Sequence, residues 1–329
     1  MIVEQQSGRN TSSAGTADIQ ARLMLLVLCL IWGLTWPAMK IALYDMPPLT
    51  MRTLTAAFGG LALLVICFAR RRSLRVRPGK DWAHVCAASL LNVVGFSLFS
   101  AFAQIAAATT RVAMLTYIMP IWTLVLAWAV LGDRPTRTQA IAIALCAVGV
   151  AILVFPLATA GVPLGLLLAL GSGFSWAAGT VYLKWARIAV DPFGLAAWQV
   201  IIAFVIIAAA MLIFDGGLEL GHAHAGAWIG VLFSGIAGNA IAYALWFDIV
   251  GRVTALTATL GVVGIPVLGV LSTIVIIGER PSHADIIGFA FIFAASVCAQ
   301  IPPSAFRRIT GRTAAPIPRY VPPSRLPDR

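Results

Sequence analysis

Three cationic side chains interrupt long apolar runs and are the residues best suited to bind a charged small molecule. Lys40 and Lys184 stand near the ends of two such runs, and Arg52 stands near the start of another. A guanidinium can hold a carboxylate through two parallel hydrogen bonds, so Arg52 could recognise an anionic group. The alternatives are structural: the lysines could extend their ammonium groups into water, and Arg52 could cap a loop or pair with Asp45.

Aromatic and amide side chains inside the apolar runs form a second candidate group. Tryptophan usually marks the membrane interface, which explains Trp32 and Trp176 poorly because both lie well inside their runs. Asn92 and Asn239 need hydrogen-bond partners, which either a ligand or a neighbouring helix could supply. The whole group is Trp32, Trp36, Asn92, Phe96, Tyr117, Trp122, Trp176, Tyr182, Asn239, Tyr243 and Trp246.

Pro37, Pro120 and Pro266 lie within apolar runs that are long enough to be helices. A proline inside a helix removes a backbone hydrogen bond and bends the helix. The bend could form a flexible wall of a binding cavity or could simply improve packing. Pro120 and Pro266 occupy matching positions of the repeat described below, which favours a shared structural role that also shapes a cavity.

The composition identifies an integral membrane protein. Hydrophobic residues make up 60% of the 329-residue chain, charged residues only 11%, and the mean hydropathy is +0.93. A water-exposed surface needs about a quarter charged residues. The net charge of +11 would suggest a nucleic-acid partner in a soluble protein, but here the cations lie mainly in short separators between apolar runs, so none is expected.

Nothing in the sequence predicts catalysis, a metal site or a cofactor. The five cysteines show no CxxC spacing, and His222 and His224 have no acid in a fixed geometry beside them. No pair of acids falls inside an apolar run, and no phosphate-binding G-x-x-x-x-G-K-[ST] loop occurs. The sequence therefore indicates a protein that is not an enzyme.

Ten apolar runs are long enough to cross a bilayer, whose core of ~30 Å needs ~20 residues in a helix. The third and fourth are separated by little more than Arg111, but one helix of both would not fit a bilayer. The predicted spans are 23–43, 49–69, 83–107, 110–131, 138–157, 163–186, 192–214, 226–249, 253–277 and 284–302.

The distribution of lysine and arginine predicts the orientation of the chain. Ten spans put both termini on one side, and nineteen of the 23 cations then fall on that side. Cations gather on the cytoplasmic side of membrane proteins. Both termini are therefore expected to be cytoplasmic, in a multi-pass protein of a bacterial-type inner membrane.

The turn "GDRPT" at residues 132–136 returns as "GERPS" at residues 278–282. "WGLTWPAMKIALYDMPP" from Trp32 likewise aligns with "WAAGTVYLKWARIAVDP" from Trp176 and matches Lys40 to Lys184, although Arg52 meets Ala196. Each turn closes five spans, and five is odd, so the second unit must be inverted. The expected divisions are a disordered tail 1–22, repeats 23–157 and 163–302, and a basic disordered tail 303–329.

The segments "WGLTWPAMK", "PPLTMR", "RVAMLTYIMPIWTLVLAWAVLGDRPT" and "IPVLGVLSTIVIIGERPS" resemble the EamA-type ten-helix members of the drug/metabolite transporter superfamily. The resemblance covers about residues 23–300. It implies a transporter of small metabolites, often amino acids or related compounds, frequently moved outward. Relatives with four helices couple protons through a glutamate in the first helix, whereas this chain has no acid between Arg22 and Asp45.

The sequence therefore predicts an all-α secondary transporter that works by alternating access around a central cavity. Its expected partners are a small solute, for which a carboxylate is favoured, and membrane lipids. A channel or a lipid scramblase on the same fold is the alternative. The sequence leaves open the solute, the direction, the coupling ion and whether the protein is a monomer or a homodimer.

Overall fold

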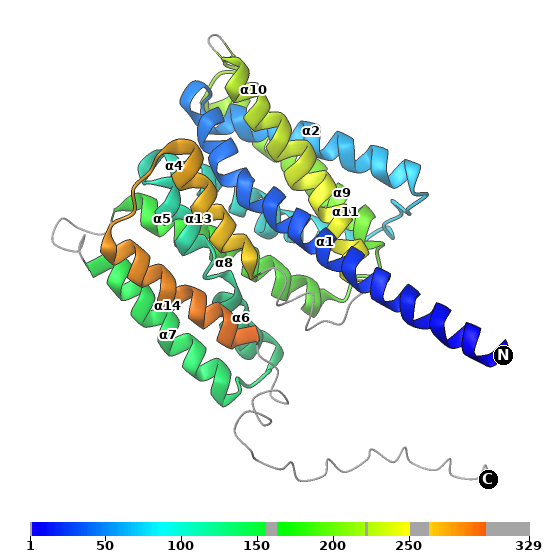
Figure 1. Cartoon of the computed structure of the whole chain (residues 1–329). Helices are drawn as coiled ribbons and strands as arrows, with labels where there is room; N and C mark the ends of the chain where they lie inside the picture. The colour runs from blue at the N-terminus through cyan, green and yellow to red at the C-terminus, as the bar shows by residue number, and fades with distance from the viewer. Residues whose placement is uncertain (1, 156–162, 221–222, 251–262, 301–329) are drawn as a thin grey trace, which may run out of the picture.

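The computed structural model describes residues 2–155, 163–220, 223–250 and 263–300, and the regular elements within these ranges are all helices. Figure 1 shows them as one bundle of long helical stretches that run roughly along a common direction. Each stretch, made of one or more consecutive helices, is called a rod below. The all-α fold expected from the sequence is confirmed. The predicted C-terminal tail 303–329 lies outside the described residues.

The first repeat folds into five rods, of which the third and fourth are built from more than one piece. The third contains a π-helical segment, η1, and the fourth is interrupted after Thr116. Its elements are α1 (Ile2–Asp45), α2 (Pro48–Ala69), α3 (Lys80–Ser89), η1 (Leu90–Gly95), α4 (Phe96–Ala106), α5 (Thr109–Thr116), α6 (Met119–Leu131) and α7 (Arg137–Val154).

The second repeat follows the same plan, and its third rod also contains a π-helical segment, η3. The beginning of its fourth rod, predicted from residue 253, lies outside the described residues. Its described elements are α8 (Leu164–Ala186), α9 (Pro192–Phe214), α10 (Ala225–Leu232), η3 (Phe233–Ile241), α11 (Ala242–Val250), α13 (Gly264–Ile277) and α14 (His283–Gln300).

Within the described residues, nine helical stretches are long and apolar enough to cross a membrane, and the shorter apolar helix α13 adds a tenth. Their bounds agree with the predicted runs to within about three residues wherever both ends are described. The agreement follows from physics, because a helix that crosses hydrocarbon must satisfy all its backbone groups internally along an uninterrupted apolar segment.

The start of α1 differs from the expectation of a disordered tail over residues 1–22. The helix begins at Ile2 and runs without a break into the first span. Residues 2–22 contain no proline, and extending an existing helix adds one hydrogen bond per residue without a new nucleation step. The first span therefore serves as a nucleus from which the polar segment continues as helix.

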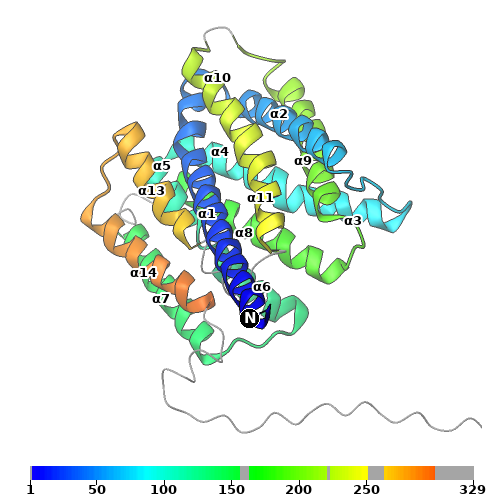
Figure 2. The ribbon, with the colours of Figure 1, turned by 45° about the vertical axis from the view of Figure 1, so that its right-hand side comes forward.

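Helix pairing displays the internal symmetry of the bundle. Helix α1 packs against α13 and against the third rod of the second repeat (α10, η3 and α11), and its repeat mate α8 packs against α6 and against the third rod of the first repeat (α3, η1 and α4). Two pairs consist of mates themselves: α2 with α9, and α7 with α14. Both pairs lie side by side in the views of Figures 1 and 2. The packing is that of two inverted five-helix repeats.

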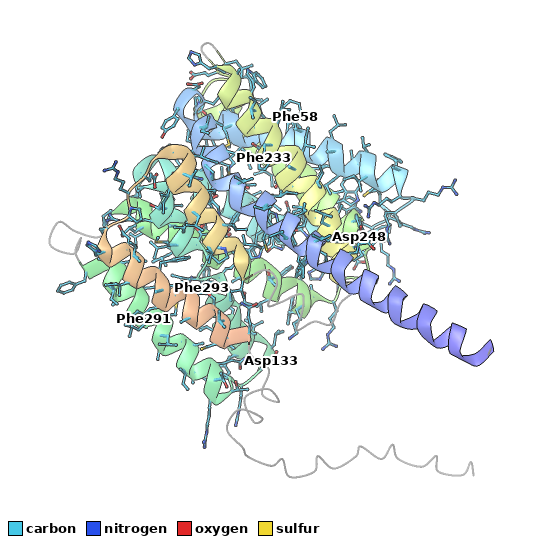
Figure 3. The ribbon with its side chains drawn as sticks, in the orientation of Figure 1. Phe58, Asp133, Phe233, Asp248, Phe291 and Phe293 are labelled. Atoms are coloured by element: carbon cyan, nitrogen blue, oxygen red, sulfur yellow. The ribbon has the colours of Figure 1, made fainter. Side chains whose placement is uncertain are left out.

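Charged contacts distinguish the two ends of the bundle. At the basic end, which holds the turns after α2, α6 and α8, Arg70 pairs with Asp248 at 2.7 Å. Figure 3 labels Asp133 and Asp248, which mark this end. At the opposite end, which holds the turns after α1, α4, α9 and α13, Arg111 pairs with Asp285 at 2.7 Å.

The two repeated turns adopt the same backbone conformation. Gly132 ends α6 with φ 75°, and Gly278 ends α13 with φ 78°, a left-handed conformation that glycine adopts without strain. Each turn then opens the next helix with a reciprocal cap, between Thr136 and Gln139 before α7 and between Ser282 and Asp285 before α14.

Helices α7 and α14 approach each other so closely that a larger side chain at their contact can test it. A Cβ atom added to Gly149 would lie 2.7 Å from the carbonyl oxygen of Gly288. We expect Gly149→Leu to force the helices apart and to lower the free energy of unfolding by about 1–3 kcal/mol. Thermal unfolding in detergent measures this. Val148→Leu, at a half-exposed neighbouring position, is the matched control, and equal melting temperatures would contradict the interface.

Candidate functional site

Arg52 lies in the second turn of α2 and is 5% exposed. A terminal nitrogen of its guanidinium donates a 2.7 Å hydrogen bond to Oγ of Ser100 on α4. Its Nε is buried and has no acceptor in the described part of the chain. Among the described residues no carboxylate lies within ion-pair distance of Arg52, and Asp45, the partner considered from the sequence, instead accepts hydrogen bonds from His224.

Lys40 reaches the same helix one turn away. Its Nζ donates a 2.6 Å hydrogen bond to the backbone carbonyl of Gln104, and it also lies over the Tyr44 ring. The side chain is half-buried and interacts electrostatically with Glu279 of the repeated turn. Lys40 therefore binds the last turn of α4, which ends at Ala106.

Lys184, the repeat mate of Lys40, has a different environment. Its Nζ lies 2.9 Å from Oδ2 of Asp133, and its side chain is 66% exposed at the basic end. This agrees with the alternative in which the ammonium group extends into water. The structure therefore separates Lys184 from Arg52 and Lys40.

Three of the predicted aromatic residues meet where α1 crosses the third rod of the second repeat. Trp32 donates a 3.1 Å hydrogen bond from Nε1 to the carbonyl oxygen of Gly238 in η3. Its ring lies 6.2 Å from that of Tyr243, edge to face, and 6.4 Å from that of Trp246. The group combines aromatic faces with a polar backbone.

Trp36 and Tyr117 form a second contact at the interruption of the fourth rod. Nε1 of Trp36 donates a 2.9 Å hydrogen bond to the hydroxyl of Tyr117, and their rings lie 5.9 Å apart. Tyr117 follows directly on the last residue of α5. The pair therefore joins the first rod to the break in the fourth.

The remaining predicted aromatic residues lie along α8 and its neighbours. Phe96 contacts Trp176 with ring centroids 5.2 Å apart, and Trp122 contacts Phe174 at 5.4 Å. Nε1 of Trp122 is buried, and no described residue accepts a hydrogen bond from it. The hydroxyl of Tyr182 instead lies 2.7 Å from Nδ1 of His84, near the basic end.

The two asparagines lie in the π-helical segments, at matching places of the two repeats. Nδ2 of Asn92 lies 3.4 Å from Oε1 of Gln199 on α9, while Oδ1 of Asn92 is buried and has no partner within the described ranges. Asn239 lies against α2, where a Cβ on Gly59 would come within 3.0 Å of its Nδ2. Each amide thus contacts the second helix of the other repeat.

Backbone carbonyls of both π-helical segments bind the first helix of the other repeat. Ser175 of α8 donates a 2.6 Å hydrogen bond to the carbonyl oxygen of Leu91 in η1. Trp32 of α1 makes the equivalent bond to Gly238 in η3. π-helical turns redirect backbone groups and often occur at functional sites. They fix the place where α1 and α8 cross their partners.

The three prolines occupy different kinds of position. Pro37 lies inside the long helix α1. Pro120 lies in the first turn of α6, directly after the interruption of the fourth rod, and Pro266 lies in the first turn of α13. The first turn of a helix tolerates proline because its N–H groups have no partner within the helix.

Sequence reasoning missed Ser100 and Gln104, which contact Arg52 and Lys40. Both are fully buried polar residues, and neither amide atom of the Gln104 side chain has a hydrogen-bond partner among the residues that the structure describes. Their spacing of four residues inside an apolar run was the signal, since it places both on one face of a helix. For metals, the described residues contain no group of three or more His, Cys, Asp or Glu side chains close enough to bind an ion.

Comparison with known proteins decides the family. The model of the EamA-like transporter family matches residues 20–155 and again residues 163–299, the two repeats seen in the structure. The chain belongs to the EamA-like transporter family. As an EamA-like protein it is a multi-pass membrane transporter, as the resemblance in its sequence predicted.

Individual relatives are similar over most of their length. The chain is 26% identical to the uncharacterized transporter YvbV of Bacillus subtilis, with 84% of this chain and 90% of the relative covered. It is 24% identical to a probable amino-acid metabolite efflux pump of Escherichia coli, with 82% and 91% covered. A solved crystal structure at 22% identity superposes with a TM-score of 0.61 and covers 88% of this chain and 98% of its own, which supports the EamA-like fold.

The Trp36–Tyr117 hydrogen bond can be measured by a double-mutant cycle. Trp36→Phe and Tyr117→Phe each keep a ring and remove one polar group, so we expect a coupling energy of about 0.5–1.5 kcal/mol in unfolding by denaturing detergent. The control cycle combines Tyr117→Phe with Trp185→Phe, an exposed tryptophan near the end of α8. Additivity in both cycles would show that the contact contributes nothing.

Proposed function

We propose that this chain is a secondary transporter that exports an amino acid or a related small carboxylate by alternating access around a central cavity. Family membership supports transport. The Escherichia coli relative is named a probable amino-acid metabolite efflux pump, which supports the outward direction and the substrate class. A relative from Salmonella typhimurium, 24% identical to this chain, has the same name.

The observation that carries the proposal is the meeting of polar and aromatic side chains from both repeats inside the bundle. Trp32 of the first repeat contacts Tyr243 of the second, and Phe96 contacts Trp176. Substrate sites of inverted-repeat transporters lie where the repeats meet, near the middle of the bilayer. Aromatic faces with a few polar groups suit a small amphipathic solute.

The contacts at the two ends support alternating access. At the basic end, Lys184 pairs with Asp133 of the first repeated turn. At the opposite end, Glu279 of the second turn accepts hydrogen bonds of 2.7 and 2.8 Å from the backbone N–H groups of Thr109 and Thr110. Each repeated turn thus joins neighbouring rods by an acid, and opening one end requires breaking such contacts while the other end stays closed.

We further propose that the basic end faces the cytoplasm of a bacterial inner membrane and that both termini lie there. The segment between α2 and α3 supports this orientation, because it contains five arginines within residues 70–77. The partners in this setting are the transported solute and the bilayer lipids.

Transport is tested with purified protein in liposomes. We expect saturable uptake of at least one labelled amino acid from a panel of L-leucine, L-phenylalanine, L-lysine and L-aspartate, without ATP. Preloading the vesicles with the same unlabelled amino acid should accelerate uptake several-fold, because a carrier returns faster when loaded. A pH gradient imposed in parallel assays tests proton coupling.

Protein-free liposomes provide the background for this assay. A flux that rises linearly with concentration and ignores preloading would contradict a carrier and favour the channel. Movement of labelled phospholipid between leaflets at the same protein density would favour the scramblase.

Orientation is tested with reporter fusions. Green fluorescent protein fused after Arg329 should fluoresce, and alkaline phosphatase fused there should be inactive, because the former folds in the cytoplasm and the latter needs an oxidising compartment. Insertion at Gly217, in the turn between α9 and α10, should give the reverse pattern. An active phosphatase at the C-terminus would overturn the assignment.

A further inference from the structure

The environment of Arg52 differs from that of the other buried or paired cations. Arg70, Arg72, Arg111 and Lys184 each lie within 4.0 Å of a carboxylate. Arg52 is more deeply buried than any of these side chains, yet its hydrogen-bond partner in the described part of the chain is a neutral hydroxyl. A buried charge without a counter-ion is costly in a membrane protein, and such charges commonly mark a substrate pathway.

Two further buried polar side chains lie on the helices that Arg52 connects. Gln104 is fully buried, and within the described residues neither its amide nitrogen nor its amide oxygen has a hydrogen-bond partner. It lies four residues after Ser100, so its side chain leaves α4 on the same face that Arg52 contacts. Thr53, the residue after Arg52 on α2, is also buried, and its hydroxyl has no partner in the described part of the chain. Buried polar groups are rarely left unsatisfied, so such groups indicate a missing partner.

We propose that Arg52 and Gln104 form the subsite that binds the α-carboxylate and α-ammonium groups of the transported amino acid. Nε and a terminal nitrogen of Arg52 supply the two parallel donors that a carboxylate accepts. The Gln104 side chain supplies one acceptor for the ammonium group and one donor for the carboxylate. The assignment rests on the proposed function and names the chemistry of its site.

The local charge favours one carboxylate over a phosphate. Lys40 is anchored to the backbone carbonyl of Gln104 and interacts electrostatically with Glu279, whereas Arg52 has no carboxylate of the described residues within ion-pair distance. The single positive charge of Arg52 then remains. At the guanidinium a single carboxylate matches this charge and the neutral Gln104 amide receives the ammonium group, whereas a doubly charged phosphate would exceed the charge of Arg52 in a low-dielectric site.

The subsite belongs to one repeat alone. Ala196 stands at the position of Arg52 in the second repeat, where it packs as a buried apolar residue. The symmetric fold therefore carries an asymmetric binding site, located between α2 and α4 toward the opposite end.

Arg52→Gln tests the subsite in the liposome assay. We expect the half-saturation concentration of the transported amino acid to rise at least about tenfold, because the bidentate charged contact is lost. Arg52→Lys should restore part of the affinity, since it keeps the charge and loses the fork. Gln104→Leu should weaken the binding of the same amino acid. Arg77→Gln, the same change at an exposed arginine, is the matched control and should leave transport unchanged.

Two further measurements separate binding from folding. The melting temperature of Arg52→Gln in detergent should equal or exceed that of the wild type, because the substitution removes a buried unpaired charge. Competition by the decarboxylated amine of the same amino acid should be weak in the wild type and should not change in the variant, since the amine has no carboxylate for Arg52 to bind.

Each alternative outcome is decisive. An unchanged half-saturation concentration in Arg52→Gln, or a clear fall in its melting temperature that Arg52→Lys reverses without loss of affinity, would make Arg52 a structural residue and overturn the subsite. Wild-type transport of amines but not amino acids would overturn the subsite and leave the transporter intact. Failure of the wild type to transport any of the panel would instead overturn the proposed substrate class, and the subsite with it.

Discussion

The odd number of spans in each repeat is the constraint on which the rest of the structure depends. Five crossings deliver the chain to the far side of the membrane, so an identical second unit must fold upside down. Mates therefore occupy opposite ends: Lys40 lies toward one end beside α4, and Lys184 lies at the other beside Asp133. The repeated turns are likewise divided between the two ends.

Hydrocarbon supplies no hydrogen bonds, and this second constraint explains the detail of the interior. The π-helical segments η1 and η3 offer the carbonyls of Leu91 and Gly238, and helices of the opposite repeat satisfy them through Ser175 and Trp32. Polar contacts thus hold the crossing points between repeats in place. Where satisfaction is incomplete among the described residues, as at Arg52 and Gln104, we propose that the transported solute completes it.

The spans could be predicted from the sequence because each is an apolar run of bilayer length, and the repeat could be predicted because its turns need glycine. The lateral contacts could not. Hydropathy does not report which helix lies beside which, so the sequence offered Asp45 as a partner for Arg52, whereas the structure gives Ser100. The break before α6 and the helical start of α1 also escaped, since both depend on local backbone geometry within otherwise permissive segments.

The self-mated pairs have a mechanical consequence. When the two ends of an inverted repeat exchange roles, the contact of α1 with α13 must exchange with that of α8 with α6. The repeat symmetry maps the contact of α7 with α14 onto itself, so this contact can stay the same in both states. The same holds for the contact of α2 with α9. In α7 and α14 the carbonyl of Gly288 packs directly against Gly149, which leaves little room between the two helices. In the alternating-access cycle proposed above, the other helices would therefore move while α7 and α14 keep their contact.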